Sequence, residues 1–373
     1  MIFVKFKYMH ESRQRRIRSV IDITDLLKLT VEKDASDLHI VVGRPPVLRV
    51  DGILHDVEDM PPLSAADTHR FIYSILTDLQ KQKFEEKKEL DFSLSISNIA
   101  RFRVNVHFQR GSVASAFRVI LSKIRNFEEL SLPKTLCETL ARRPFGLIMI
   151  TGPTGSGKST TLAAMVDLIN RERECHIITI EDPIEYLHSH KKALIEQREV
   201  NEDTFSFANA LKYVLRQDPD VIMVGEMRDL ETIGAAITAA ETGHLVFSTL
   251  HTVDVVQTMD RIIDVFPPYQ QDQIRIQLAG VIEGVLCQKL LPSSMARGRE
   301  ISVEIMIATE AIRSLIREGK THQIYAMLEA GGKYGMQTMD RALINLYKKG
   351  RIKKEMALMN AKNLDEMKRH LFS

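Results

Sequence analysis

The chain has 373 residues, of which 44% are hydrophobic and 27% are charged, and its net charge is +2. This length is enough for two domains with cores of their own, and the composition is that of a globular protein. The near-neutral charge gives no global field toward nucleic acid or an anionic membrane. No apolar run approaches the roughly 20 residues that span a bilayer. Cys137, Cys175 and Cys287 form neither a C-x-x-C pair nor a disulfide framework, which predicts a reducing cytosol.

Residues 1–20 are basic and show little apolar periodicity. Charges interrupt any hydrophobic region, so the segment does not have the pattern of a secretory signal. We expect a disordered tail over residues 1–20. A basic arm that touches phosphate or lipid is the alternative.

Residues 21–125 predict a first α+β domain, and residues 126–144 predict a mixed helix and linker. Helical spacing of apolar residues, alternating apolar and polar residues, and Gly- or Pro-containing turns mark the elements. The expected helices are Ile23–Val31 and Ala65–Glu89, and the expected strands are Asp37–Val42, Val47–Val50, Leu90–Ile96, Ala100–Gln109 and Val113–Ile120.

Residues 145–373 alternate between strand and helix patterns, which is typical of a parallel α/β sheet. The expected strands are Leu147–Ile150, His176–Ile180, Val221–Val224, Leu245–Thr249 and Ile301–Ile307. The expected helices between them are Thr160–Arg171, Phe205–Arg216, Leu230–Glu241 and Tyr269–Val285. From Thr309 the tail is mostly helical: Ala311–Glu318, Thr321–Glu329, Met336–Lys349 and Asn363–Leu371.

A complete phosphate-loop motif, G-x-x-x-x-G-K-[ST], lies between the first strand and first helix of this second domain. Its glycines let backbone N–H groups point at phosphate oxygens, and the helix that follows directs its positive end toward the same anion. Lys158 is placed to reach the β- and γ-phosphates, and the Ser159 hydroxyl to hold Mg²⁺. The residues expected to bind ATP are Gly152, Pro153, Thr154, Gly155, Ser156, Gly157, Lys158, Ser159 and Thr160.

Two further strands end in carboxylates, and active sites of α/β sheets lie at these strand ends. Glu226 follows Val221–Val224, where it is expected to serve Mg²⁺ through a bound water, although Gly225 stands in the place of the usual Asp. Glu185 follows His176–Ile180 and Pro183, and it is expected to act as general base for the attacking water. The reverse assignment of the two carboxylates is the alternative.

Two histidines bracket the strand Leu245–Thr249. His251 at its end is a candidate donor to the γ-phosphate that senses its loss, and the alternative is an ordinary polar strand terminus. In the first domain, Arg103 and Arg118 lie on predicted strands and Arg110 lies in the turn between them. They are candidate fingers for the γ-phosphate of a neighbouring subunit, and a solvated strand face is the alternative.

Together these residues resemble the secretion-ATPase superfamily of hexameric RecA-like motors, and within it the bacterial type IV pilus retraction ATPases of the PilT type. Four segments carry the resemblance: the phosphate loop, the Asp box Ile180–Glu185, the Walker B segment Asp218–Glu226 with Met227–Asp229, and the His box Thr242–Thr252. Cys287 lacks the second thiol of the zinc element found in assembly and type II secretion ATPases. The segment Ala311–Glu318 resembles the A-I-R-x-L-I-R-E helix of retraction ATPases.

The resemblance implies a PAS-like first domain that docks on the next subunit, then a RecA-like P-loop ATPase domain with a helical C-terminal extension. It implies Glu185 and Glu226 as catalytic carboxylates and His244 and His251 as His-box residues near the nucleotide. It favours Arg103 and Arg118 as trans-acting fingers.

The implied function is a homohexameric cytoplasmic ATPase, dependent on ATP and Mg²⁺, that powers type IV pilus retraction and twitching motility. Its expected partners are an inner-membrane platform protein at the pilus base and a paralogous retraction ATPase, so that it meets the membrane only through partners. One alternative is an accessory, assembly or secretion ATPase of the same superfamily. A nucleic-acid motor is a second alternative, but no basic stripe with aromatic residues supports it, and we expect no nucleic-acid partner.

Overall fold

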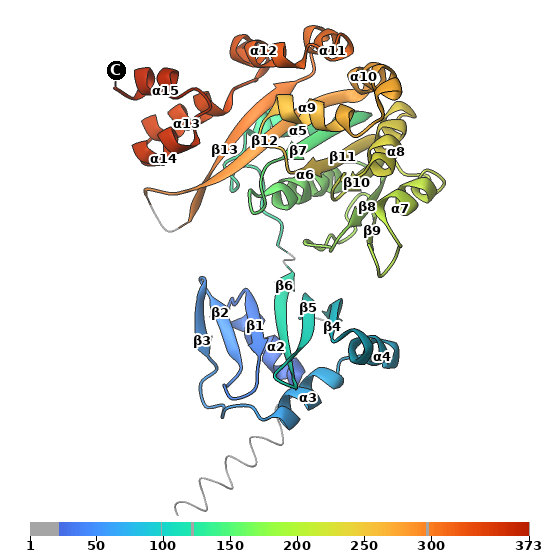
Figure 1. Ribbon diagram of the computed structural model, residues 1–373, viewed down its shortest axis with the longest axis vertical. Helices are drawn as coiled ribbons and strands as arrows, with labels where there is room; N and C mark the ends of the chain where they lie inside the picture. Colours follow the sequence, from blue (N-terminus) through green and yellow to red (C-terminus); the bar gives the residue numbers. More distant parts are fainter. Residues whose placement is uncertain (1–21, 98, 121–122, 296–297, 373) are drawn as a thin grey trace, which may run out of the picture. The chain divides into compact units, whose positions relative to one another are not determined.

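The computed structural model describes residues 22–97, 99–120, 123–295 and 298–372, so the segment expected as a tail over residues 1–20 lies outside them. The chain divides into two compact units between residues 122 and 123 (Figure 1). No helix among the described residues is long and apolar enough to cross a membrane.

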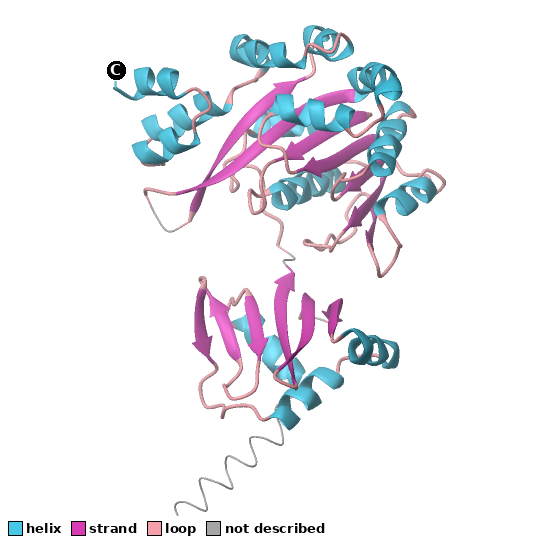
Figure 2. Cartoon of the chain, in the orientation of Figure 1, coloured by secondary structure: helices cyan, strands magenta, loops and turns pink. Residues whose placement is uncertain are grey.

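The first unit contains a six-stranded antiparallel sheet with strand order β3-β2-β1-β6-β5-β4. Alternate residues along these strands, such as Leu38, Phe102 and Phe117, are fully buried against the helices. Figures 1 and 2 show the elements of this unit: α2 (Ile23–Glu32), β1 (Asp37–Ile40), β2 (Val47–Val50), β3 (Ile53–Asp56), α3 (Ala65–Tyr73), α4 (Asp78–Lys87), β4 (Glu89–Ile96), β5 (Ala100–Gln109) and β6 (Ser112–Ile120).

The prediction of one helix over Ala65–Glu89 is wrong, because the segment forms two helices. The first ends at Tyr73, and Thr77 begins the second with a capping box in which its hydroxyl accepts from the Gln80 N–H and Gln80 accepts from the Thr77 N–H. A capping box satisfies two backbone donors that a continuous helix would satisfy internally. Helix α4 is mostly polar and buries Phe84 alone among its residues, so no change in apolar periodicity marks the break in the sequence.

The second unit is built on a seven-stranded sheet with order β13-β12-β7-β11-β10-β8-β9. All neighbouring pairs are parallel except β12 with β13. Its elements up to the last strand are α5 (Lys134–Ala141), β7 (Gly146–Thr151), α6 (Lys158–Glu172), β8 (His176–Glu181), β9 (Leu194–Glu199), α7 (Phe207–Val214), β10 (Val221–Val224), α8 (Leu230–Glu241), β11 (Leu245–Leu250), α9 (Val255–Asp264), α10 (Pro268–Val281), β12 (Ile282–Pro292) and β13 (Arg299–Ile307).

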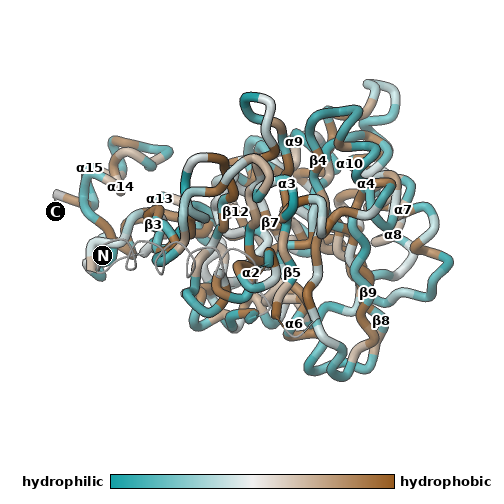
Figure 3. Tube along the Cα trace, turned by 90° about the horizontal axis from the view of Figure 1, so that it is seen from below, coloured by the Kyte–Doolittle hydropathy of each residue, from teal (hydrophilic) through white to brown (hydrophobic). Residues whose placement is uncertain are grey.

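Helices cover both faces of this sheet (Figure 2). Along β7, Leu147 and Met149 pack into the core with α7 to α10, whereas Ile148 and Ile150 pack into the core with α5 and α6. In Figure 3 the hydrophobic, brown parts of the trace include β7 and β12. Residues 126–144, which we expected as a mixed helix and linker, contain α5 and lie in this unit, where Leu140 is buried in the second of these cores.

One helix of this unit, α10, is shorter than predicted, and three elements were not predicted: β12, β9 and α9. The helix expected over Tyr269–Val285 ends at Val281, and β12 runs on from it between β7 and β13. Gly284 lies where an added Cβ would be 2.8 Å from Leu140, so close packing against α5 fixes this residue. Strand β9 was not predicted because most of its residues are polar. Helix α9 was not predicted either, although its apolar residues recur at helical spacing, with Val255, Met259 and Ile262 buried on one face.

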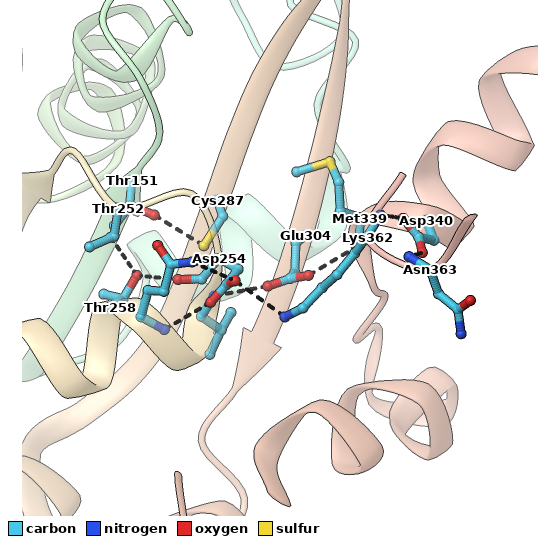
Figure 4. A network of polar contacts seen from close by, with 12 residues as sticks. Thr151, Thr252, Asp254, Thr258, Cys287, Glu304, Met339, Asp340, Lys362 and Asn363 are labelled. Atoms are coloured by element: carbon cyan, nitrogen blue, oxygen red, sulfur yellow. Dashed lines mark hydrogen bonds and ion pairs between the residues drawn. The ribbon is translucent and has the colours of Figure 1, made fainter. Parts of the chain in front are cut away.

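The C-terminal helices are α11 (Glu310–Arg317), η1 (Thr321–Gln323), α12 (Ile324–Ala330), η2 (Gly331–Tyr334), α13 (Met339–Lys348), α14 (Lys354–Asn360) and α15 (Leu364–Phe372). A polar network joins α13 and the α14–α15 loop to the sheet (Figure 4). The Glu304 carboxylate accepts from the first N–H groups of two helices, Val255 at 2.9 Å and Met339 at 3.2 Å. Lys362 then binds Asp254, the residue that caps α9.

Candidate nucleotide-binding site

The phosphate loop connects β7 to α6 and depends on glycine at two positions. Gly152 has φ +140°, and a Cβ there would lie 2.3 Å from the Gln288 carbonyl oxygen. Gly157 has φ +92° and is the residue before the first turn of α6. These left-handed conformations are accessible to glycine and strained for other residues. The loop therefore curls tightly above the helix N-terminus, as the motif predicts.

Within this loop the Lys158 ammonium donates to the carbonyl oxygens of Gly152 at 2.8 Å and Pro153 at 3.3 Å. Burial lowers the pKa of Lys158, although the charges of Glu226 and Glu185 act in the opposite direction. Both carboxylates are thus close enough to affect this lysine. Ser156 is 2% exposed, and its buried hydroxyl has no hydrogen-bond partner among the described residues.

Glu226 lies directly after β10, and both of its carboxylate oxygens are engaged. Arg228 donates to one oxygen at 2.8 Å, and His251 Nε2 is 3.3 Å from the other. Burial acts to raise the pKa of Glu226, but the hydrogen bond from Arg228 and the charge of His251 outweigh it, and the pKa is lowered. The structure therefore brings Glu226 and the candidate sensor His251 together, a contact that was not predicted from the sequence.

The glycine in place of the usual Asp has a packing reason. A Cβ at Gly225 would lie 3.2 Å from the Ile180 carbonyl oxygen of β8. The Gly225 N–H donates to that same oxygen at 2.8 Å, and the Thr249 hydroxyl donates to the Gly225 carbonyl. The ends of β8, β10 and β11 are therefore packed closely around Gly225, and a side chain there would require the backbone beside it to shift by a few tenths of an ångström.

The Asp box follows β8, where Glu185 is exposed and Glu181 is buried. Burial raises the pKa of Glu181 to about 7, although the Thr179 hydroxyl, the Gln197 amide and the Glu185 N–H all donate to it. Gln197 also donates to the Tyr186 carbonyl oxygen, and the Tyr186 hydroxyl is 2.9 Å from the Thr160 hydroxyl of α6. This chain of hydrogen bonds joins the loop of Glu185 to the helix of the phosphate loop.

Four residues of this region had no predicted role: Glu181, Tyr186, Gln197 and Arg228. Arg228 follows Glu226 in a Met-Arg-Asp tripeptide, so its place beside the Walker B carboxylate was readable from the motif. The partners on β9 were not, because they meet the Asp box only through strand pairing with β8.

His244 is not part of this cluster. It precedes β11, and its ring nitrogen Nδ1 is 2.9 Å from the Ala239 carbonyl oxygen at the end of α8. Strand β11 runs parallel to β7, with Leu245 beside Gly146 and Leu250 beside Thr151. At about 3.3 Å per residue, His244 lies roughly 20 Å from the phosphate loop, at the opposite edge of the sheet. Its expected contact with a nucleotide on this loop is therefore corrected: within the chain, His244 caps a helix.

The candidate arginines belong to the first unit. Arg103 and Arg118 are direct cross-strand neighbours on β5 and β6. The Arg118 guanidinium donates through Nε to Asp37 at 2.8 Å. Arg110 lies in the turn that joins the two strands, seven residues along β5 from Arg103, so it is roughly 24 Å away. One phosphate group cannot contact all three side chains.

The donor set fits Mg-ATP. A curled loop of backbone amides, an ammonium group and an orphaned buried hydroxyl suit phosphate oxygens. Mg²⁺ takes few protein ligands when it is carried on phosphates, and Ser159 at the start of α6 with Glu226 across the site supplies such ligands. The described residues contain no group of three or more His, Cys, Asp or Glu that would hold a metal by itself.

A phosphate loop at the carboxyl edge of a parallel sheet, facing two carboxylates and a histidine, defines a P-loop ATPase domain. The family described as Type II/IV secretion system protein matches residues 13–357. The chain therefore belongs to this family, whose members are secretion ATPases.

Individual relatives narrow this placement. A protein of Pseudomonas aeruginosa described as the type IV pilus retraction ATPase PilT is 48% identical over 342 residues, which cover 92% of this chain and 98% of that protein. A crystal structure of the pilus retraction motor PilT with bound ADP has a TM-score of 0.88 and 48% identity, covering 94% of this chain and 99% of the other. The P. aeruginosa type IV pilus ATPase PilU is 40% identical over 348 residues, 93% of this chain and 91% of that protein.

Proposed function

We propose that this chain is the motor subunit of a hexameric ATPase that hydrolyses ATP to retract a type IV pilus. One observation carries the proposal: the phosphate loop and the candidate carboxylates lie at the same end of the parallel sheet. The charges of Glu226 and Glu185 both act on Lys158 of the loop, and His251 contacts Glu226. Full-length similarity to pilus retraction ATPases, over both units, supports the assignment to retraction.

The proposed mechanism begins with an exchange of partners. Lys158 leaves the Gly152 and Pro153 carbonyl oxygens for the β- and γ-phosphates, with the Ser156 hydroxyl buried beneath them. Mg²⁺ would neutralise the negative charge that develops on the phosphates, and the residues that would hold it are Ser159 directly and Glu226 through a bound water. Glu226 gives up its hydrogen bond from Arg228 to take this role, and Glu185 accepts the proton of the attacking water.

His251 remains beside Glu226 and senses the γ-phosphate. Because His251 leads directly into α9 and its cap Asp254, a change at the phosphate reaches α9 through covalent connection. We propose that Arg103 and Arg118 of one subunit approach the phosphates bound by the next, so that binding closes the interface and hydrolysis opens it.

The retraction role also includes α11, the helix of the A-I-R-x-L-I-R-E motif. Arg313 donates to Glu283 at 2.6 Å and to the Ala279 carbonyl oxygen at 2.7 Å, so it fastens α11 to the end of α10. Arg317 is exposed. We propose that this helix serves the contact with an inner-membrane platform protein, which holds the motor at the cytoplasmic face of the pilus base.

The experiment that tests the function has a genetic and a biochemical part. Deletion of the gene is expected to lengthen surface pili and stop surface motility, and unchanged pili would contradict retraction. Purified protein is expected to hydrolyse Mg-ATP, and Glu185→Gln to lower the rate about 100-fold. Equal, near-background rates for both proteins would favour an accessory role, which is the second candidate function.

A mixing experiment tests whether the arginines act across subunits. Arg103→Ala subunits keep an intact phosphate site, whereas Lys158→Ala subunits keep intact arginines. Mixed hexamers are therefore expected to recover part of the hydrolysis that each variant lacks alone. No recovery, with mixing verified by mass, would count against trans-acting arginines.

A further inference from the structure

A row of charged side chains crosses the outer face of the sheet in the first unit. Direct cross-strand pairing places Arg103 on β5 beside Arg118 on β6, Arg118 beside Asp37 on β1, and Asp37 beside Arg49 on β2. Residues paired directly across strands project from the same face. The intervening residues, such as Phe102 and Phe117, are buried in the core on the opposite face.

Asp37 is the only acid among these four residues, and it is 5% exposed. One of its oxygens accepts from Arg118 Nε at 2.8 Å, and the other accepts from the Ser36 hydroxyl at 2.8 Å, with Arg49 Nε 3.8 Å away. A buried carboxylate that accepts from a guanidinium and a hydroxyl, with a second arginine nearby, is held in one position by these partners. Asp37 is therefore a rigid anchor.

Asp37 holds Arg118 through a single nitrogen of its guanidinium group. Only the Nε edge of the guanidinium binds Asp37, while the Arg118 side chain as a whole is 68% exposed. An arginine held by Nε presents its two terminal nitrogens outward as a planar fork, the geometry that binds phosphate through two hydrogen bonds. Arg103, exposed on the adjacent strand, adds a second positive charge beside that fork.

We infer that Asp37 is a positioning residue for catalysis, which orients the Arg118 fork toward the phosphates bound by a neighbouring subunit. This inference rests on the proposed trans-acting role of Arg118. Pre-organisation matters because a free arginine loses side-chain entropy when it binds, whereas an anchored one has lost it already. Asp37 contributes to the transition state through Arg118 and makes no contact with the nucleotide itself.

The test compares steady-state Mg-ATP hydrolysis by full-length variants. Arg118→Ala is expected to lower kcat about 100-fold or more. Asp37→Asn is expected to lower kcat at least 10-fold while the KM for ATP changes less than threefold, because the nucleotide still binds its own phosphate loop. In the Asp37→Asn/Arg118→Ala double variant, kcat is expected to equal that of Arg118→Ala within twofold, since Asp37 acts only through Arg118.

The matched control is Asp56→Asn. Asp56 makes an ion pair of the same kind, with Arg44 Nε at 2.8 Å, but it lies on β3 and its side chain is 45% exposed. Its kcat is expected to stay within twofold of the wild type. If Asp37→Asn behaves like this control, or if the double variant loses an additional 10-fold, the inference is overturned.

A second variant carries the test if Asp37→Asn does not fold. Arg118→Lys keeps the positive charge at an exposed position but loses the planar fork, so it is expected to be as slow as Arg118→Ala. Retention of more than a third of the wild-type kcat by Arg118→Lys would overturn the inference. Normal hydrolysis by Arg118→Ala would instead remove Arg118 from the proposed mechanism, and the positioning role with it.

Discussion

Two carboxylates in the second unit, Glu304 and Glu226, differ in the groups that donate hydrogen bonds to them. Glu304 is 1% exposed, and its two oxygens accept hydrogen bonds from the backbone N–H groups of Val255 and Met339. Figure 4 shows the network around Glu304. Glu226, at the nucleotide edge, is held instead by the exposed side chains of Arg228 and His251.

The difference separates structural acids from reactive ones. Glu304 cannot change partners without uncovering the first amides of two helices, which costs about 1–3 kcal/mol for each buried group. Glu226 exchanges partners at small cost, because an ion pair with an exposed arginine contributes about 0–1 kcal/mol. Acids with buried amide partners therefore hold the fold, and acids with exposed partners are available to a ligand.

The largest expected effect tests the exchange at the nucleotide edge. Lys158→Ala removes the group that must leave the loop carbonyls for the phosphates, so we expect turnover to fall about 1000-fold in a phosphate-release assay. The thermal unfolding midpoint should not change, and Lys212→Ala, at an exposed position on α7, is the control. Normal turnover would refute the phosphate assignment.

The next largest effect is the loss of stability expected when the buried acid Glu304 is removed. Glu304→Ala leaves two helix amides without an acceptor, and we expect a loss of about 3 kcal/mol, or a midpoint lower by about 5–10 °C. Glu310→Ala, whose side chain is 87% exposed, should change the midpoint by less than 1 °C, which is roughly the scale of a surface substitution. Equal midpoints for the two variants would break the distinction drawn above.

The two histidines of one motif sharpen the comparison. His251→Ala removes a partner of Glu226, and we expect kcat to fall roughly 10- to 100-fold. His244→Ala removes a cap on α8, and we expect unchanged kcat with a midpoint lower by about 2–4 °C. Hydrolysis that depends on both histidines alike would mean that His244 approaches a nucleotide in the assembled ring.

The smallest effect concerns Glu181. Its folded pKa of about 7 lies above the ordinary value of 4.5, so the folded state binds the proton more tightly than the unfolded state does. Stability from this group is therefore lost as pH rises from 4.5 to 7 and stays low above pH 7. Between pH 5 and pH 8 we expect Glu181→Gln to gain on the order of 1 kcal/mol over the wild type. A constant difference between the two proteins, by thermal unfolding at both pH values, would contradict the raised pKa.

Much of the nucleotide edge was predictable from the sequence because its residues follow strands directly. The phosphate loop, Glu185, Glu226 and His251 each come after a predicted strand, and parallel strands bring their carboxyl ends to one edge. His244 was misplaced because the motif gives its position in the chain, whereas the direction of β11 decides which edge it reaches.

Other features depended on contacts that no local pattern encodes. The break before Thr77 depends on a capping box at the start of a mostly polar segment, whose residues give no apolar signal of where a helix begins. Asp37 was read only as the start of a strand, since its partners Arg118 and Arg49 come from β6 and β2. Glu181 joins Tyr186 and Gln197 because β9 pairs with β8.

The sequence by itself determined a phosphate-loop motif, two candidate catalytic acids and a candidate sensor histidine, at fixed spacings on a strand–helix alternation. Local physics suffices there, because glycine conformations, strand ends and a helix N-terminus are set by neighbouring residues. Only the tertiary structure decided which charged groups are bound to buried backbone amides, as Glu304 is, and which have exposed partners that a ligand can replace, as Glu226 has. That outcome depends on burial and on partners from distant strands, which strand order and register supply.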